Sequence, residues 1–267
     1  MDENRYFETI AEYKLLAKHE VGQNFLIDKN VSKRIVDLLK VDHDDRVLEI
    51  GSGAGSLSFY LAMHNVPTTL IDIDEGLITK LKNDFEGFTN VSIYQANALK
   101  YDMSPFTKII GNLPYYITSS LLERVLLNAS SCKISTIMVQ KEVFSRLSSL
   151  PKQEGYGPLS LLIAYRSIIK KEFVVPRTSF TPSPHVDSLV FTLTFKEGAS
   201  IELANALYSF ASALFLHRRK TILNNLSFYL KDEEKAKDAL SQCGILPSKR
   251  PEEIDLNSYL KLLSILH

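Results

Sequence analysis

The sequence has few cysteines, no long apolar run and no net charge. Its 267 residues include only Cys132 and Cys243, too few for a disulfide framework and without metal-ligand spacing. We therefore expect two reduced, buried thiols in a reducing compartment. No apolar run approaches the roughly 20 residues that span a bilayer, and the first residues lack the apolar core of a signal peptide. These absences predict a cytoplasmic protein that does not enter a membrane.

The charges are balanced in number but not in position. The chain has 31 basic and 31 acidic side chains, so its total charge does not indicate a nucleic-acid partner. Residues 141–180, however, carry seven Lys or Arg against three acids, and residues 211–231 carry four against none. Such blocks favour one phosphate-facing side of the molecule, although charge blocks are also common on ordinary solvated surfaces.

The stretch from Lys108 to Thr118 organises the rest of the chain. An apolar run ends at Gly111 and is followed at once by Asn112, Leu113, Pro114 and Tyr115. The Asn112 amide can both accept and donate hydrogen bonds, Pro114 stiffens the loop, and Tyr115 offers a flat aromatic face. Together these groups predict a slot for a planar base with an exocyclic amine. The alternative is a plain strand-to-loop turn with exposed tyrosines.

A strand, a glycine turn and a helix precede this slot. Residues 45–50 predict a strand, Gly51-Ser-Gly-Ala-Gly55 a tight turn and residues 56–63 a helix, the first unit of a doubly wound sheet. A dinucleotide fingerprint would have glycine in place of Ser56, and the Glu49 carboxylate would repel a pyrophosphate. A ligand with an adenosine and a positive charge fits better, so we favour S-adenosylmethionine over NAD.

Further strands place polar residues at the same edge of the predicted sheet. Asp72 lies in the predicted strand 68–74, 21 residues after Gly51, which is about the usual spacing for an acid that binds ribose. Asn97 follows the strand 91–95, whereas Asp74 is explained as the N-cap of helix 75–84.

The remaining pattern completes an α/β fold. We expect helix 119–128 with a Ser120–Glu123 capping box, strand 134–139, helix 141–149, helix 159–166 and strands at 173–175 and 186–195. The last strands predict an antiparallel edge on a mostly parallel, Rossmann-like sheet. From residue 200 the pattern is helical, at 201–216, 217–230, 232–242 and 255–266. The predicted domains are therefore 1–198 and 199–267.

Six ordered segments resemble the ribosomal RNA adenine dimethyltransferases. They are Gly22–Leu26, Glu49–Gly55, Asn112–Thr118, Phe180–Ser188, His217–Leu226 and Arg250–Ile254. Gly22 before Gln23 and the Arg-Arg-Lys run resemble the small-subunit branch of the family, and the erythromycin-resistance methylases of large-subunit RNA are the close alternative. The resemblance implies a class I methyltransferase domain followed by a helical domain that binds ribosomal RNA.

The resemblance also implies roles for individual residues. The donor contacts would be Asn24, Leu26, Gly51, Asp72, Asn97 and Asn112. The Asn112 side chain and the Leu113 carbonyl would hold the target amine, Tyr115 and Phe180 would stack the base, and Arg218, Arg219 and Lys220 would grip phosphates. Asn97 departs from the aspartate that is usual in the family, and an amide can still accept from an adenine amine. We expect S-adenosylmethionine as donor, no metal, small-subunit ribosomal RNA as partner and a monomer.

Two other functions compete with this one. A nicotinamide dehydrogenase would share the sheet, but Glu49, Ser56 and the lack of a hydride-relay constellation argue against it. A ribosome-assembly factor without catalysis would share the RNA-binding residues, but the intact Asn112–Tyr115 stretch argues against that.

Overall fold

The computed structural model describes residues 2–12 and 23–266, and of Tyr115 the backbone alone. Helix α1 runs from Glu3 to Glu12 and overlaps residues 5–18, where the scattered apolar positions suggest a short helix or arm; residues 13–18 and Gly22 lie outside the described residues. The chain forms two compact units. The first consists of Met1–Phe144 and Ile169–Phe195, and the second of Ser145–Ile168 and Lys196–His267.

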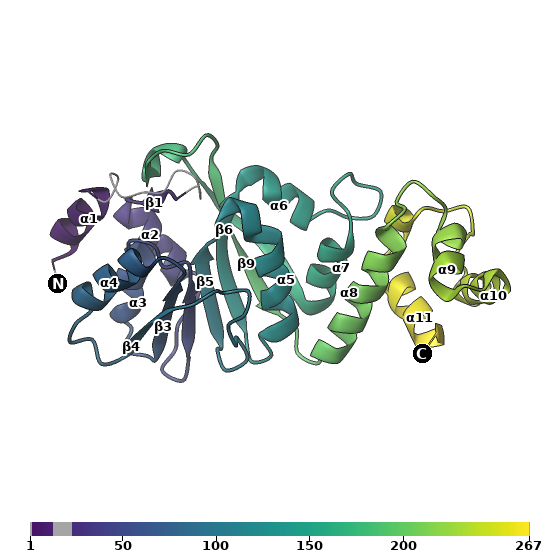
Figure 1. The fold of residues 1–267 in the computed structure, drawn as a ribbon, viewed down its shortest axis with the longest axis horizontal. Helices are drawn as coiled ribbons and strands as arrows, with labels where there is room; N and C mark the ends of the chain where they lie inside the picture. Colours follow the sequence, from purple (N-terminus) through teal and green to yellow (C-terminus); the bar gives the residue numbers. More distant parts are fainter. Residues whose placement is uncertain (1, 13–22, 267) are drawn as a thin grey trace. The chain divides into compact units, whose positions relative to one another are not determined.

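The first unit is built on a seven-stranded sheet of order β4-β3-β2-β5-β6-β9-β7 (Figure 1). The strands are β2 Val47–Ile50, β3 Thr68–Asp72, β4 Val91–Gln95, β5 Lys108–Asn112, β6 Ile134–Gln140, β7 Ser167–Val175 and β9 Ser188–Phe195. Strands β4, β3, β2, β5 and β6 pair in parallel, and β9 runs antiparallel to β6. The doubly wound, mostly parallel sheet is therefore confirmed. Its antiparallel strand lies next to the last in the order, with β7 beyond it.

Amphipathic helices cover this sheet. They are α2 Lys29–Asp37, α3 Ser56–Ala62, α4 Glu75–Asp84, α5 Thr118–Asn128 and α6 Lys141–Leu147. One apolar cluster joins α2 and α3 to β5, β6 and β9, and a second joins α1, α3 and α4 to β3. The N-cap predicted at Asp74 is confirmed, since its side chain accepts from Gly76 and Leu77 N–H. Asp28 likewise caps α2 by accepting from Asn30 and Val31 N–H.

A small separate sheet holds two of the family-like segments together. Strand β1, Phe25–Leu26, pairs antiparallel with β8, Phe180–Thr181, so that Leu26 lies opposite Phe180. A 3₁₀ turn, η4 (Arg177–Ser179), leads into β8. This pairing brings residues near the start of the described chain against a segment that follows the long strand β7.

Three local predictions are wrong. The strand expected at 173–175 begins at Ser167, because β7 is an outer strand whose exposed lysines break the apolar pattern. Helix α5 begins at Thr118, directly after the 3₁₀ turn η3 (Tyr115–Ile117), and Ile117 at its N-cap position makes no side-chain capping hydrogen bond, so Ser120 and Glu123 form no capping box. The helix expected at 217–230 begins only at Ile222, because Thr221 caps it by accepting from Asn224 N–H at 3.3 Å.

The second unit is helical around its own apolar core. Its helices are α7 Pro158–Arg166, α8 Ile201–Phe215, α9 Ile222–Leu230, α10 Glu233–Cys243 and α11 Leu256–Leu266, with the 3₁₀ turn η5 Pro251–Glu253. Phe210, Leu226, Leu240 and Tyr259 are central members of that core. The Tyr156 hydroxyl donates to Ile254 O at 2.8 Å, which ties the loop before α7 to the tail helices.

Two findings bear on the expectations from composition. Neither Cys132, which is buried, nor Cys243, which is half-buried, forms a disulfide. Within residues 2–12 and 23–266, none of the helices has the length and apolarity needed to cross a membrane.

Gly111 is required by the close approach of β2 and β5. A Cβ atom there would lie 2.6 Å from Ile50 O and 3.0 Å from a Leu113 methyl group. We expect Gly111→Ala to lower the free energy of unfolding by about 1–3 kcal/mol, as overpacking does, in urea titrations. Gly157→Ala is the control, because its Cβ would meet only Phe215 at 3.9 Å. Equal stability of the two variants would contradict this role of Gly111.

Candidate active site

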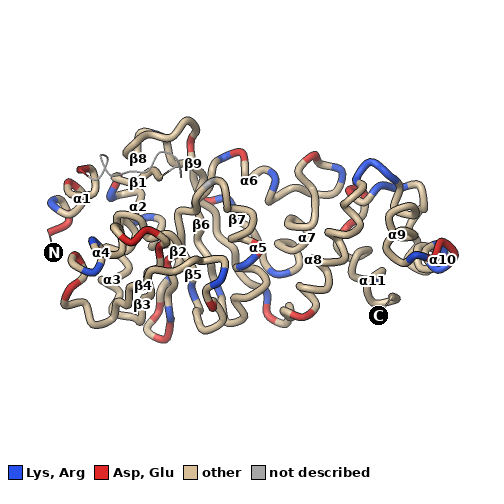
Figure 2. The backbone as a smooth tube through the Cα atoms, viewed as in Figure 1, with Lys and Arg blue, Asp and Glu red and all other residues tan. Residues whose placement is uncertain are grey.

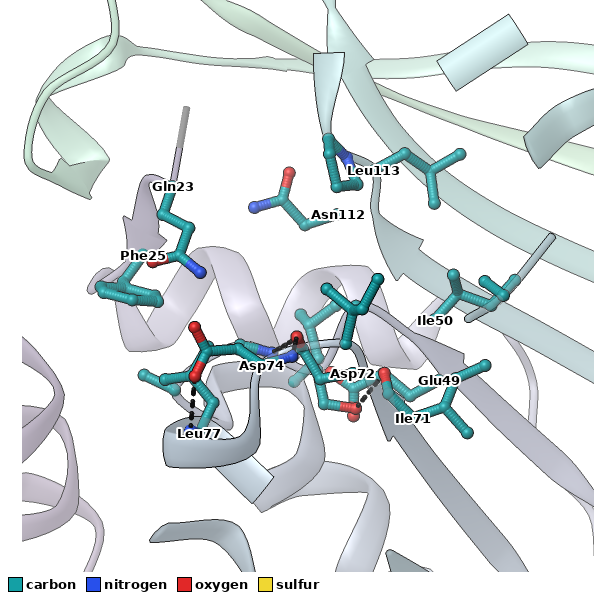
Figure 3. A pocket seen from close by; sticks show the side chains of 18 of the residues that line it. Gln23, Phe25, Glu49, Ile50, Ile71, Asp72, Asp74, Leu77, Asn112 and Leu113 are labelled. Carbon is teal, nitrogen blue, oxygen red and sulfur yellow. Dashed lines mark hydrogen bonds between the residues drawn. The ribbon is translucent and has the colours of Figure 1, made fainter. Parts of the chain in front are cut away.

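A pocket opens at the carboxyl ends of the central strands (Figure 3). Its walls come from the segment around β1, from the ends of β2 and β3, from the residues after β4 and from the end of β5 with η3. This is the edge at which open α/β sheets bind ligands. All the elements that line it belong to the first unit.

The glycine turn forms the floor of the pocket. Gly51, Gly53 and Gly55 have φ values of +68°, +54° and +95°, a region that side chains with a Cβ rarely adopt. Gly53 N–H donates to Asp72 Oδ2 at 2.9 Å, and Asp74 N–H donates to Asp72 Oδ1 at 2.9 Å. The Asp72 carboxylate thus joins the turn after β2 to the turn after β3.

Asp72 keeps the capacity to bind a ligand. A carboxylate offers about four lone-pair sites, and the backbone donors Gly53, Asp74 and Ile73 occupy only part of them. Burial raises the pKa of Asp72, although the N–H groups of Asp74 and Gly53 act in the opposite direction. Vicinal hydroxyl groups of a ribose are suitable further donors to these oxygens.

Glu49 is a buried acid beside the same floor. Its side chain is 1% exposed, and Oε2 accepts from the Ser58 hydroxyl at 2.6 Å. Burial is the main cause that raises its pKa to about 8; the Ser58 hydrogen bond acts in the opposite direction, and the nearby Asp72 adds a smaller upward effect. Burial thus favours the neutral form of Glu49 when no ligand is bound, and a cationic ligand would favour the charged form.

Asn112 and Leu113, called the Asn112 corner below, line the pocket at the end of β5. Figure 3 shows the Asn112 amide pointing into the cavity opposite Gln23 and Phe25, while the Leu113 side chain points away. A Cβ on Gly51 would lie 3.7 Å from Asn112 O, so the corner and the glycine turn are neighbours. Leu113 is 1% exposed, and its N–H donates to Met138 O at 3.1 Å. These contacts fix the peptide from which the corner projects.

The other donor contacts implied by the resemblance also line the pocket. Asn24 and Leu26 come from the segment of β1, and Asn97 follows β4. Asn97 Oδ1 accepts from Leu99 N–H at 2.9 Å. The amide oxygen thus uses one of its two lone pairs in a turn, and its second lone pair and the amide N–H groups can be directed at a ligand.

Several predicted substrate contacts do not line this pocket, and the side chain of one of them lies outside the described residues. The side chain of Tyr115 lies outside the described residues, although its backbone begins η3. Phe180 is 3% exposed and packs in the cluster of Leu26, Val175 and Val190, so it is a core residue in this structure. The basic residues Arg218, Arg219 and Lys220 belong to the second unit.

Sequence reasoning gave no role to several residues that line the pocket. Gln23, Ile73 and Tyr116 all line the cavity, and Ile73 and Tyr116 are 65% and 66% exposed. Each is next in the chain to a residue that was selected from the sequence. This proximity to a motif was the signal that could have identified them. Ile73 was not selected because its neighbours Asp72 and Asp74 already explained this segment. A large apolar side chain that is exposed in a pocket is nevertheless suited to contact a flat ring. Asp74 also lines the cavity in addition to capping α4.

The pocket chemistry fits a cationic adenosine derivative. It combines two buried or half-buried acids, a backbone turn and an exposed apolar side chain, which match an ammonium or sulfonium charge, a ribose and a flat base. Among the residues that the structure describes, no group of three or more His, Cys, Asp or Glu has metal-binding geometry. The sheet order and this site together define a class I methyltransferase fold.

The family follows from comparison with known proteins. The model of the family "Ribosomal RNA adenine dimethylase" matches residues 15–267, and the chain belongs to this family. The ribosomal RNA small subunit methyltransferase A of Streptococcus gordonii is 34% identical, over 93% of this chain and 91% of that protein.

Solved structures agree with this assignment. A dimethyladenosine transferase from Plasmodium falciparum superposes with a TM-score of 0.77 and 26% identity, covering 90% of this chain and 96% of that one. The 23S rRNA methyltransferase ErmE gives a TM-score of 0.64 and 25% identity, covering 90% and 98%. The adenine-dimethyltransferase resemblance and the fold that it implied are therefore confirmed.

Glu49 should make stability depend on pH. Its folded pKa of about 8 exceeds its ordinary value of 4.5. Between these values the folded chain retains a proton that the unfolded chain loses, so its contribution to stability falls as pH rises. Relative to wild type, Glu49→Gln should gain on the order of 3 kcal/mol from pH 5 to pH 8 in urea unfolding without ligand. Glu86→Gln, an exposed carboxyl, is the control, and parallel curves for wild type and Glu49→Gln would refute the assignment.

Proposed function

We propose that this chain transfers methyl groups from S-adenosylmethionine to the N6 amines of two adjacent adenosines in small-subunit ribosomal RNA. The main support for this proposal, beyond membership of the family, is that the Asn112 amide points into a pocket whose floor is the glycine turn. The small-subunit target is supported by the name of the 34% identical relative. The likeness to ErmE supports large-subunit RNA as the second candidate.

The donor would lie along the floor of the pocket. Asp72 would accept from its ribose hydroxyls, Gly51 would adjoin its methionine end, and Asn97 with Ile73 would hold its adenine. Asn24, Leu26 and Asn112 would complete the walls. When bound, the donor supplies an activated methyl group on a sulfonium, so the protein needs no metal and no strong base. Its cationic charge favours the ionised forms of Glu49 and Asp72, which burial otherwise opposes.

The target amine would meet the Asn112 corner. An adenine amine is a weak nucleophile because its lone pair is delocalised into the ring. Hydrogen bonds from that amine to Asn112 Oδ1 and to Leu113 O would favour a tetrahedral nitrogen and free the lone pair for in-line attack. Fixing the two reactants in line contributes roughly 7–11 kcal/mol to such reactions. Tyr115 would stack the base, and stacking by Phe180 would require that side chain to leave its core cluster.

The second unit would hold the RNA. Arg219 and Lys220 are exposed, whereas Arg218 Nε lies 3.7 Å from Glu252 Oε2. Arg219 and Lys220 are therefore the stronger phosphate contacts of the three. We retain residues 199–267 as the RNA-binding domain and 1–198 as the transferase domain, in a cytoplasmic enzyme that acts as a monomer.

A methylation assay tests this function directly. Under-methylated small subunits, intact large subunits and protein-free ribosomal RNA would each be incubated with tritiated S-adenosylmethionine. We expect label in the small subunits, recovered as dimethyladenosine after nuclease digestion. Label in large-subunit RNA alone would move the assignment to the second candidate, and no label on any RNA with donor bound would favour an assembly factor.

Removing the Asn112 amide should stop catalysis without unfolding the chain. We expect Asn112→Ala to lower kcat by at least about 100-fold, as for other preorganised hydrogen bonds that act in the transition state. Asn128→Ala, at the far end of α5, is the control for loss of an asparagine, and unfolding curves check the fold. Turnover close to that of the control would remove Asn112 from the mechanism.

Neutralising the basic turn should weaken RNA binding in a salt-dependent way. For the triple change Arg218→Gln, Arg219→Gln and Lys220→Gln, we expect lower affinity for small subunits. The slope of log affinity against log salt should flatten by up to about 2, because fewer counterions are released.

A second triple variant controls for the change in net charge. Lys235→Gln, Lys237→Gln and Lys261→Gln removes the same charge from exposed positions on α10 and α11. If both triple variants flatten the slope equally, the basic turn has no special role in phosphate binding.

A further inference from the structure

An apolar groove lies on the surface of the second unit, away from its core. It is lined by the end of α8, by α9 and by the residue after α9, namely Ala213, Leu216, Ser227, Phe228, Tyr229 and Lys231. Leu216, Phe228 and Tyr229 are 69%, 67% and 43% exposed. Side chains of this size are usually covered in a helical domain, so their exposure side by side needs an explanation.

The two aromatic rings of the groove differ in how they are held. Tyr229 packs edge-on against the buried Phe210, with ring centroids 5.3 Å apart and planes at 72°. Phe228 has an edge-on contact with His217, at 5.7 Å and 80°. Tyr229 is thus anchored in the core of the unit. Phe228 is braced by the His217 ring and presents most of its surface to solvent.

One cation lines the groove, and three more precede α9 in the sequence. Residues 211–231 contain Arg218, Arg219, Lys220 and Lys231 and no Asp or Glu. Figure 2 shows Lys and Arg along the loop that enters α9. Lys231 itself lines the groove. These cations therefore favour an anionic occupant.

A buried asparagine holds the basic turn in shape. Asn225 is 2% exposed, and its Nδ2 lies 3.2 Å from His217 O, 3.4 Å from Lys220 O and 3.0 Å from Thr221 O. These three carbonyl groups span the turn that carries Arg218, Arg219 and Lys220. The three cations are thus presented from a fixed backbone that directly follows His217, the residue whose ring contacts Phe228.

We propose that this groove binds an unstacked base of ribosomal RNA on the Phe228 ring, with Arg219, Lys220 and Lys231 on the adjoining phosphates. Exposed aromatic rings beside cations are how proteins hold single-stranded or looped RNA, in which bases are free to leave the stack. A docking protein would need acidic side chains to match these cations. The inference rests on the proposed function, because it names a second contact to the same RNA.

The binding test compares variants of Phe228 on under-methylated small subunits at several salt concentrations. Phe228→Ala should weaken binding about 5- to 150-fold, the equivalent of one stacked base, with an unchanged salt slope, because no phosphate contact is lost. Phe228→Leu should weaken it nearly as much, because an aliphatic chain cannot stack. Leu203→Ala, an exposed apolar residue at the opposite end of α8, should bind as wild type. Wild-type binding by Phe228→Ala, or full rescue by Phe228→Leu, would overturn the proposal.

A fluorescence test separates RNA stacking from protein contact. The chain contains no tryptophan, so Phe228→Trp introduces a single indole fluorophore at the groove, and Leu203→Trp is the control. Titration with protein-free small-subunit RNA should quench the indole of the Phe228→Trp variant and leave that of the control unchanged. Equal quenching in both variants, or no quenching in Phe228→Trp, would overturn base stacking.

The two proposals can fail separately. If wild type methylates small subunits while the binding and fluorescence tests fail, this inference falls and the proposed function stands. If wild type labels no RNA, the proposed function falls.

Discussion

The pocket depends on the way a single carboxylate joins two loops. Asp72 accepts from Gly53 N–H and from Asp74 N–H, which places the glycine turn and the start of α4 around one cavity. This arrangement has an electrostatic cost, because Asp72 and Glu49 are acids with raised pKa values in the same partly buried site. A cationic ligand relieves that cost, whereas a pyrophosphate would add to it. Selection of a sulfonium donor over a dinucleotide thus follows from the same interaction that shapes the pocket.

The glycine turn is also supported from the side away from the cavity. The Tyr6 hydroxyl lies 3.3 Å from Ala54 O and 3.4 Å from Gly55 O, and the buried Lys80 ammonium donates to Ala54 O at 3.0 Å. Lys80 also lies 4.9 Å from the centre of the Tyr6 ring and pairs with Asp84. The turn therefore has carboxylate contacts on one side and a cation on the other. Gly55 cannot carry a side chain, because a Cβ there would overlap the Tyr6 hydroxyl.

The sequence predicts the pocket better than it predicts the surroundings. Glu49, Gly51, Asp72, Asn97 and Asn112 were all placed at one sheet edge, because parallel strands present their carboxyl ends together. Phe180 was expected to stack the target base, but the pairing of β8 with β1 buries it. No local sequence pattern reveals a contact between segments so far apart in the chain. The contacts of Tyr6 and Lys80 with the glycine turn could not be predicted for the same reason. The start of β7 was not predicted because the exposed lysines of this outer strand interrupt the alternation of apolar and polar residues.

The zero net charge constrains how such a chain can recognise RNA. Long-range attraction to a polyanion requires excess positive charge, and 31 acids cancel 31 bases here. Affinity must then come from short-range contacts at a few fixed sites. The turn held by Asn225 provides cations in a set geometry, but Arg218 is partly neutralised by Glu252. With so little excess charge, non-ionic contacts such as stacking have to supply a larger share of the binding free energy. The exposed ring of Phe228 beside that turn is the group of the second unit best suited to do so.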